Sequence, residues 1–437
     1  MLSVINQFFS TKLTRSFIGV SAQYLLGVLL LFVMNIVLAR TMSVSDFGTF
    51  GFVLSLSTVL SIPVSGGLSM LLTREIAGYT QTCNWSAYRG LVKVAYWWVI
   101  LASIICGLAL ICLITIIERV PTHHFFIAFS LVPIVGFNMI RNGILKGLGH
   151  PILAEGPTMI LQPMLLIIAY LMLAYLGLIS AINALLFYFV VIFIVFGMTS
   201  MMMFWVQPSS VYAAKSDMID KPLWCRALPP FMLMSATTLL STQIAILIAG
   251  FMGKDEVVAY IRVAERGAMV SIIPFHVLSS IISPQIVAAI RSSDIRELRD
   301  IVRRSSQLMF FSALPFVIII LLFGEQIIDL LFGSKYGKNS YLPMVIVSVT
   351  QVFLGAFGLT GLLLTMGGQE REILISQILA LCINFILCIM LIGPFGAVGA
   401  SIGVAVGLLV STAINVLLIK RYFGFTPGIF MRQCFKF

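Results

Sequence analysis

Charged residues are scarce in this sequence. Of its 437 residues 10% are charged, against about 25% in an average soluble domain. Only 16 residues are acidic and four are histidine, whereas 60% are hydrophobic. So little charge excludes an ordinary soluble domain, and the apolar runs that recur along the sequence predict an all-α polytopic membrane protein.

The sequence also lacks the motifs of metal, nucleotide and covalent chemistry. Its seven cysteines form no Cys-x-x-Cys pair and no cluster with histidine, so we expect free thiols and no metal site. Nothing that resembles Gly-Lys-Ser/Thr follows Gly149 or Gly368, which argues against a phosphate-binding loop. We therefore expect no cofactor and no enzymatic reaction.

Twelve apolar segments can be marked, each long enough to cross a bilayer as a helix. They cover approximately residues 17–39, 47–72, 92–117, 123–145, 152–175, 179–205, 227–252, 257–290, 306–331, 341–366, 373–393 and 397–419. Of the 27 Lys and Arg residues, twenty lie at the two ends of the sequence or in even-numbered connections, and five lie in odd-numbered connections. Cytoplasmic connections carry the excess of Lys and Arg, so both termini are predicted to be cytoplasmic.

The net charge of +11 is explained by this topology. The Lys and Arg residues lie in connections that flank the membrane and are not interleaved with aromatic residues, so we expect no nucleic-acid partner. The outer connections are short and leave no room for an external domain.

The two halves of the sequence repeat. Aligned pairs are Met42 with Met252 and Asp46 with Glu256 at an offset of 210, and Gly149 with Gly368, Gly177 with Gly396 and Ala181 with Ala400 at an offset of 219. Six segments separate equivalent points, so the halves share an orientation and are expected to form two six-helix bundles around a central cavity. We place these bundles at 1–210 and 227–437, joined by a cytoplasmic linker at 211–226. This architecture is typical of a transporter.

The segment 257–290 carries charge where lipid is expected. On a helix, Arg262, Glu265 and Arg266 fall within one arc of about 100°. Arg266 would then lie about 13 Å deep, close to the midplane of a hydrocarbon core about 30 Å thick. A lone Arg at that depth costs at least about 3 kcal/mol, so this stripe must face protein or water. Arg262, one turn nearer the outer surface, is expected to reach interfacial water.

Two interpretations of the stripe remain open. In one, Glu265 offsets one guanidinium charge and leaves a net positive site suited to an anionic group; in the other, Glu265 pairs with Arg262 or Arg266 and holds two helices together. His276 lies on the same stripe and either carries protons or packs as a hydrogen-bonded residue. Arg40, an outer-side cation at a helix end, has either a cavity role or an anchoring role.

Five blocks of the sequence resemble one family. They are LARTMSVSDFGTFGF at 38–52, GGLSMLLTREIA at 66–77, VVAYIRVAERGAMVSIIPFHVLSSIISPQIV at 257–287, LLFGEQIIDLLFGSKYGKNSYLPMVIV at 321–347, and MGGQ at 366–369 with FGAVGASIGVAV at 395–406. In this order they resemble the Wzx-type O-antigen and polysaccharide flippases of the multidrug/oligosaccharidyl-lipid/polysaccharide (MOP) superfamily. The resemblance covers nearly the whole chain.

The resemblance implies a fold and a substrate. Two six-helix bundles would form a V around the cavity, and the substrate would be an undecaprenyl-diphosphate-linked oligosaccharide, such as an O-antigen repeat unit of lipopolysaccharide. It would move from the cytoplasmic to the outer leaflet of the cell inner membrane by alternating access. The resemblance allows for a polysaccharide polymerase, a chain-length regulator and a coupling ion as further partners.

The same resemblance assigns roles and leaves two alternatives. Arg266 matches a cavity arginine of the related lipid II flippases. Those flippases carry an Arg-Asp pair where this sequence has Met34 and Asn35, which argues against lipid II as the substrate. One alternative, an ion-coupled multidrug exporter, is disfavoured because the first segment has no acid. The other, a membrane glycosyltransferase or polymerase that uses the same lipid carrier, is disfavoured by the short outer connections.

Reporter fusions test the predicted topology. A fusion after Arg15, one at Lys215 and one after Arg432 are expected to report the cytoplasm, and one at Lys335 the outer side, because Lys and Arg are retained on the cytoplasmic side. An external signal at Lys215 would contradict the twelve-segment arrangement, since that connection joins the two halves.

Overall fold

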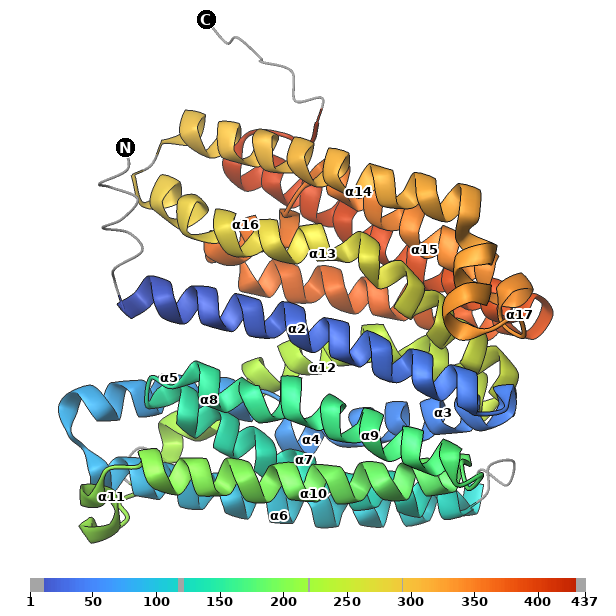
Figure 1. Cartoon of the computed structure of the whole chain (residues 1–437). Helices are drawn as coiled ribbons and strands as arrows, with labels where there is room; N and C mark the ends of the chain where they lie inside the picture. The colour runs from blue at the N-terminus through green and yellow to red at the C-terminus, as the bar shows by residue number, and fades with distance from the viewer. Residues whose placement is uncertain (1–11, 117–121, 219–220, 293, 430–437) are drawn as a thin grey trace, which may run out of the picture. The chain divides into compact units, whose positions relative to one another are not determined.

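The computed structural model describes residues 12–116, 122–218, 221–292 and 294–429. Within these ranges the chain is helical and contains no strand, which confirms the predicted all-α class (Figure 1). The helices are α2 Lys12–Thr41, α3 Val44–Leu60, α4 Ile62–Ser65, α5 Leu68–Thr82, α6 Trp85–Ile116, α7 Thr122–Gly147, α8 Pro151–Gly156, η1 Pro157–Leu161, α9 Gln162–Tyr175, α10 Ala181–Val206, α11 Ser209–Ala213, α12 Lys221–Phe251, α13 Asp255–Arg291, α14 Ile295–Phe332, α15 Gly337–Phe357, α16 Thr360–Met366 and α17 Glu370–Phe423.

The helix boundaries repeat at both offsets found in the sequence. Adding 210 to the bounds of α2, of α3 to α5 taken together, and of α6 gives the bounds of α12, α13 and α14 to within about six residues. Adding 219 to the bounds of α7, of α8 to α9, and of α10 gives those of α15 to α16 and of the two parts of α17. Each half of the chain therefore lays out its helices in the same order, as the sequence repeat predicts.

A break at Gly396 divides α17. At 1.5 Å per residue its 54 residues would measure about 80 Å as one rod, more than twice the thickness of the hydrocarbon core. Gly396 adopts a φ of 57° inside α17, a left-handed conformation that only glycine adopts without strain. Gly177 stands at the aligned position of the first half and has a φ of 68°. The chain turns at both glycines, between the two predicted apolar segments on either side.

Nine helices in the described ranges are long and apolar enough to cross a membrane, or ten if α3 and the segment 62–82, bent by 40° at their junction, count as one crossing. The long α17 counts once among the nine, and α13 is not among them. These helices confirm a polytopic membrane protein. The number of twelve crossings stays a prediction.

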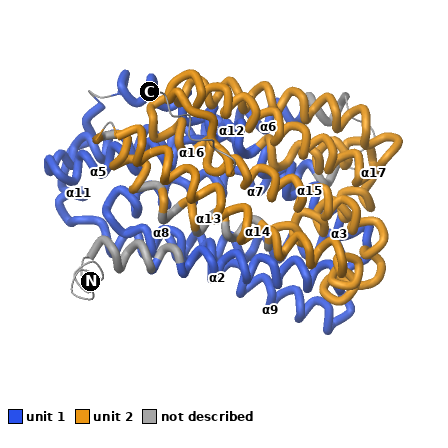
Figure 2. The backbone as a smooth tube through the Cα atoms, turned by 90° about the horizontal axis from the view of Figure 1, so that it is seen from above, with its two compact units in different colours: residues 1–239 blue, residues 240–437 orange. Residues whose placement is uncertain are grey.

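The chain divides into two compact units, Met1–Leu239 and Leu240–Phe437 (Figure 2). The division falls inside α12, whereas the connection between the bundles is predicted at 211–226. The first turns of α12 are fastened to unit 1: Trp224 Nε1 donates to the Tyr79 hydroxyl at 2.9 Å, and Ser235 Oγ accepts from the Gly67 N–H at 3.1 Å. Half of this helix therefore packs as part of the first unit.

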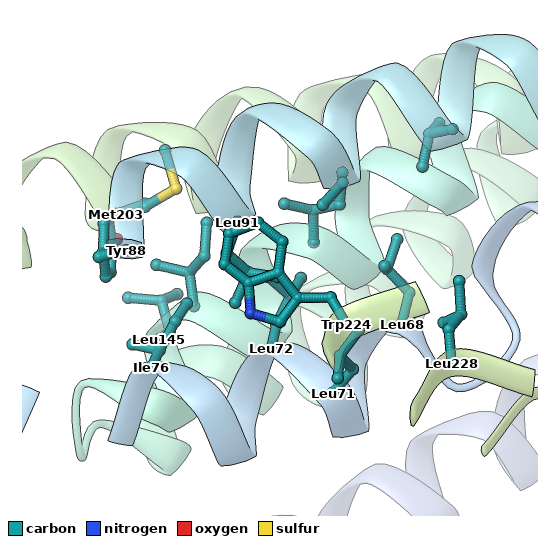
Figure 3. Packing of buried hydrophobic residues seen from close by; sticks show 14 of the residues in the cluster. Leu68, Leu71, Leu72, Ile76, Tyr88, Leu91, Leu145, Met203, Trp224 and Leu228 are labelled. Atoms are coloured by element: carbon teal, nitrogen blue, oxygen red, sulfur yellow. The ribbon is translucent and has the colours of Figure 1, made fainter. Parts of the chain in front are cut away.

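The core of unit 1 gathers around Trp224, whose side chain is 2% exposed. Figure 3 shows its indole among Leu72 of α5, Leu91 of α6 and Leu228 of α12. Side chains at helical spacing on each of these helices supply the cluster, because residues three and four apart share a face. The cluster joins α12 to the helices that precede it by more than a hundred residues.

In each unit, a charged side chain at the start of the second helical segment forms hydrogen bonds with the backbone where the fifth segment meets the sixth. We call this contact a clamp. In unit 1, Asp46 Oδ1 accepts from the N–H of Ala181, the first residue of α10, at 3.2 Å. In unit 2, Lys254 Nζ donates to the carbonyls of Ile392 and Gly393 at 3.1 and 2.8 Å. A helix N-terminus favours an anion and a helix C-terminus favours a cation, so each clamp carries the charge that suits the helix end it binds. The two clamping residues are not aligned with each other, since Asp46 aligns with Glu256 and Lys254 with Val44.

Replacing Trp224 tests the assignment of α12 to unit 1. Trp224→Ala is expected to destabilise the protein by about 3–5 kcal/mol, because it removes a fully buried indole. Trp224→Phe keeps most of the volume and loses the bond to Tyr79, for a cost of about 1 kcal/mol. The thermal unfolding midpoint in detergent measures both. Trp205→Ala, at a site 79% exposed, is the control, and an equal loss there would contradict the packing.

Candidate functional site

The candidate site lies on α13, in unit 2. This helix starts with Asp255 and Glu256, acidic residues that favour a helix N-terminus. One face carries small apolar residues and packs against α14 and α15. At Gly267 a side chain would collide with the thioether of Met344 on α15, so α13 approaches that helix closely. The site is therefore held on a rigid, closely packed helix.

The three predicted charged residues lie within five consecutive positions on this helix, at two degrees of burial. Arg262 is 7% exposed and belongs to the packed face, whereas Glu265 and Arg266 are half-buried. The expectation that Arg262 reaches interfacial water is therefore wrong: neighbours on either side of it, Ile261 and Val263, are buried with it. Its position near the start of the helix does not determine which way it faces.

Arg266 makes one weak contact in the described part of the chain. Its Nη1 donates to Met269 Sδ at 3.2 Å, one helical turn further on. A thioether is a weak acceptor, and a guanidinium has five N–H donors. Among the described residues no carboxylate or carbonyl accepts from Arg266. Its guanidinium retains donors for another partner.

Glu265 forms no ion pair within the described ranges, although the charges of both Arg266 and Arg262 act on it. Adjacent residues on a helix point about 100° apart, so Glu265 and Arg266 do not face each other. The group of three residues carries one negative and two positive charges, and thus a net charge of +1. Arg266 lies eleven residues into α13, or about 16 Å along it, and its depth in the membrane stays a prediction.

The other predicted site residues have different surroundings. The side chain of His276 lies outside the described part of the chain. Arg40 is exposed in the last turn of α2, where a cation interacts favourably with the helix dipole. Arg40 belongs to unit 1 and the other four residues to unit 2. No group of three or more His, Cys, Asp or Glu residues in the described ranges could hold a metal ion.

Arg141 is a buried cation whose position was predicted wrongly. The charge count places it among the cytoplasmic flanks, but it lies inside the apolar helix span Phe125–Gly147 and is 7% exposed. Its Nη1 donates to the carbonyl of Phe137 at 2.9 Å, and its guanidinium carbon lies 3.7 Å from the centre of the Phe196 ring. A cation over an aromatic face gains about 2 kcal/mol when desolvated, which helps to hold it there. The sequence signal for this burial is that Arg141 lies inside the apolar run 123–145.

A family model described as polysaccharide biosynthesis protein matches residues 13–290, more than half of the chain. The probable low-salt glycan biosynthesis flippase Agl15 of Haloferax volcanii is 22% identical over 172 residues. That match covers 39% of this chain and 36% of Agl15, so the chain aligns with little more than a third of this curated relative.

Solved structures share the fold over nearly the whole chain. An inward-facing multidrug resistance MATE family transporter of the MOP superfamily has a TM-score of 0.73 at 17% identity, with 91% of this chain and 94% of that chain covered. The lipid II flippase MurJ, in an inward closed conformation, has a TM-score of 0.64 at 14% identity, with 92% and 87% covered. Together with the family match, this confirms the resemblance drawn from the five sequence blocks: the chain belongs to the polysaccharide biosynthesis protein family and has the fold of MOP superfamily transporters.

Proposed function

We propose that the protein is a flippase for an undecaprenyl-diphosphate-linked oligosaccharide, the repeat unit of O-antigen or another surface polysaccharide. It moves this lipid from the cytoplasmic to the outer leaflet of the cell inner membrane by alternating access, with both termini in the cytoplasm. The family match and the flippase name of the archaeal relative support a lipid-linked glycan as substrate. A polysaccharide polymerase and a chain-length regulator, acting on the delivered repeat unit, complete the proposal.

The observation that carries this proposal is the state of Arg266. A diphosphate must pass through a medium in which an unpaired charge costs several kcal/mol. Arg266 is half-buried, with a thioether as its contact among the described residues. A guanidinium can give a diphosphate two parallel hydrogen bonds, and such charge-assisted bonds are about twice as strong as neutral ones. Glu265 leaves the site net positive, as an anionic substrate requires.

The first helix supports a glycan substrate over an ion-coupled drug. Asn35 on α2 is 1% exposed and donates from Nδ2 to the carbonyl of Leu31 at 2.7 Å, within its own helix. An amide in that position does not titrate, and its neighbour Met34 is buried and apolar. An acid within a membrane helix can serve as a coupling site, and the first helix offers none at this position, which argues against that alternative. Glycosyl transfer is argued against by the matched proteins, which are named as transporters and flippases.

Substitution of Arg266 tests the proposal. In proteoliposomes, Arg266→Ala is expected to slow leaflet exchange of a lipid-diphosphate glycan about ten- to a hundredfold, the value of one hydrogen bond to a charged group. Arg266→Lys keeps the charge, loses the planar fork and is expected to retain partial exchange. Rates are compared at equal protein in the membrane. Full exchange by Arg266→Ala would contradict the ligand role, and chain elongation of the glycan would instead indicate a polymerase.

Two neighbouring substitutions serve as controls. Glu265→Gln changes exchange at constant abundance if Glu265 tunes a binding site, and lowers abundance if it has a structural role. Arg262→Ala is expected to lower abundance or thermal stability, because Arg262 is 7% exposed. If Arg262→Ala loses exchange and Arg266→Ala does not, the proposal is contradicted, because the substrate would then bind at Arg262, one turn before Arg266.

A further inference from the structure

A cavity of about 820 Å³ opens beside the first half of α6, in unit 1. Its walls are α6 and the connection that follows α11. Six of its lining residues matter here: the cations Arg89, Lys93 and Lys215, the aromatic residues Tyr96 and Trp97, and Ile100. None of the residues that line it is acidic.

The connection is fixed in place by contacts with α6. Arg89 Nη1 donates to the carbonyls of Tyr212 and Ala214, at 3.0 and 2.6 Å, and the N–H of Asp217 donates to the carbonyl of Ser86 at 3.0 Å. At Gly90 a side chain would collide with the backbone carbonyl of Asp217, so the connection lies directly against the helix. The cavity is therefore a built feature of unit 1 and does not depend on a loose loop.

A fourth cation lies behind the aromatic wall. The ring of Tyr96 lies 5.7 Å from that of Phe137, and the carbonyl of Phe137 accepts the hydrogen bond of the buried Arg141. In the described part of the chain no carboxylate pairs with Arg141. Three cations line the cavity and a fourth, Arg141, lies behind Tyr96, and none of the residues that line the cavity is an acid that could pair with them.

The exposed face of α6 changes in character along its length. Arg89 and Lys93 come first, then Trp97, which is 63% exposed, and then Ile104 and Leu108, which are 55% and 61% exposed. Cations at headgroup level, aromatic residues at the interface and aliphatic residues below follow the profile of one bilayer leaflet. At 1.5 Å per residue, Trp97 and Leu108 lie about 16 Å apart, close to half of a hydrocarbon core about 30 Å thick.

We propose that this cavity binds the phosphate of an anionic membrane phospholipid, whose acyl chains lie along the aliphatic face of α6. The three cations supply the positive charge that a phosphate needs, and no acidic residue of the lining neutralises them. Trp97 lies where the glycerol backbone meets the hydrocarbon. The cavity is at the end of α6 predicted to be cytoplasmic, and anionic lipids concentrate in the cytoplasmic leaflet. A free phosphate would use the cations and leave the aromatic and aliphatic part of this surface unused. The inference does not depend on the transported substrate.

Lipid retention and thermal stabilisation test this site. The full chain in detergent is titrated with phosphatidylglycerol, with phosphatidylcholine and with inorganic phosphate, and bound lipid is counted by native mass spectrometry beside the unfolding midpoint. We expect phosphatidylglycerol to be retained and to raise the midpoint. Equal effects of phosphatidylcholine, or of inorganic phosphate at the same concentration, would overturn the proposal, as would retention of a lipid diphosphate but not of phosphatidylglycerol.

Charge substitutions locate the binding. Lys93→Gln combined with Lys215→Gln is expected to weaken phosphatidylglycerol binding about tenfold or more, whereas Arg at both positions retains it. Both lysines are exposed, so the lipid-free unfolding midpoint should match that of the wild type. The matched control removes two exposed cations of unit 2, Arg371→Gln with Lys420→Gln. An equal loss in this control, or unchanged binding by the Lys93 and Lys215 double variant, would overturn the assignment.

Discussion

Every backbone N–H and C=O group that hydrocarbon surrounds must find its partner within the chain. Helices meet this requirement along their length and fail at their ends, where four donors or four acceptors are left over. The clamps of Asp46 on α10 and Lys254 on α17 act at such ends. They let the chain reverse direction in a few residues, which keeps the connections on that side short and the successive helices antiparallel.

The same cost applies to charged side chains, and the protein meets it in three ways. Arg141 is stabilised by an aromatic face and a carbonyl of its own helix. Arg262 is buried beside its apolar neighbours Ile261 and Val263 on α13. Arg266 is half-buried and has a thioether as its contact among the described residues. Arg141 also keeps one buried donor, Nε, without a hydrogen bond, so what separates Arg266 from the other two arginines is exposure: Arg141 and Arg262 are each 7% exposed, whereas Arg266 is half-buried.

The sequence predicts the helices and their repeat well, because both depend on long apolar runs and on spacing. Each of the twelve apolar segments coincides with one helix, with part of a helix or with a run of two or three helices, and Gly177 and Gly396 mark equivalent turns. The interruptions are missed: the breaks around Ser61 and at Gly358 interrupt apolar runs without changing hydropathy. The placement of Arg141 and Arg262 is missed for a related reason, since periodicity identifies faces but only tertiary packing decides which face is covered.

The opposite charges of the two clamps limit how the halves can be exchanged. Asp46 binds the N-terminal end of one helix, and Lys254 binds the C-terminal end of another. At the offset of 210 Lys254 aligns with Val44, so a chimera that carried the first-half segment into the second half would leave the carbonyls of Ile392 and Gly393 without the ammonium group from which they accept. The halves have therefore diverged into parts that are alike in layout but not interchangeable, and each must keep its clamp together with the helix end that the clamp satisfies.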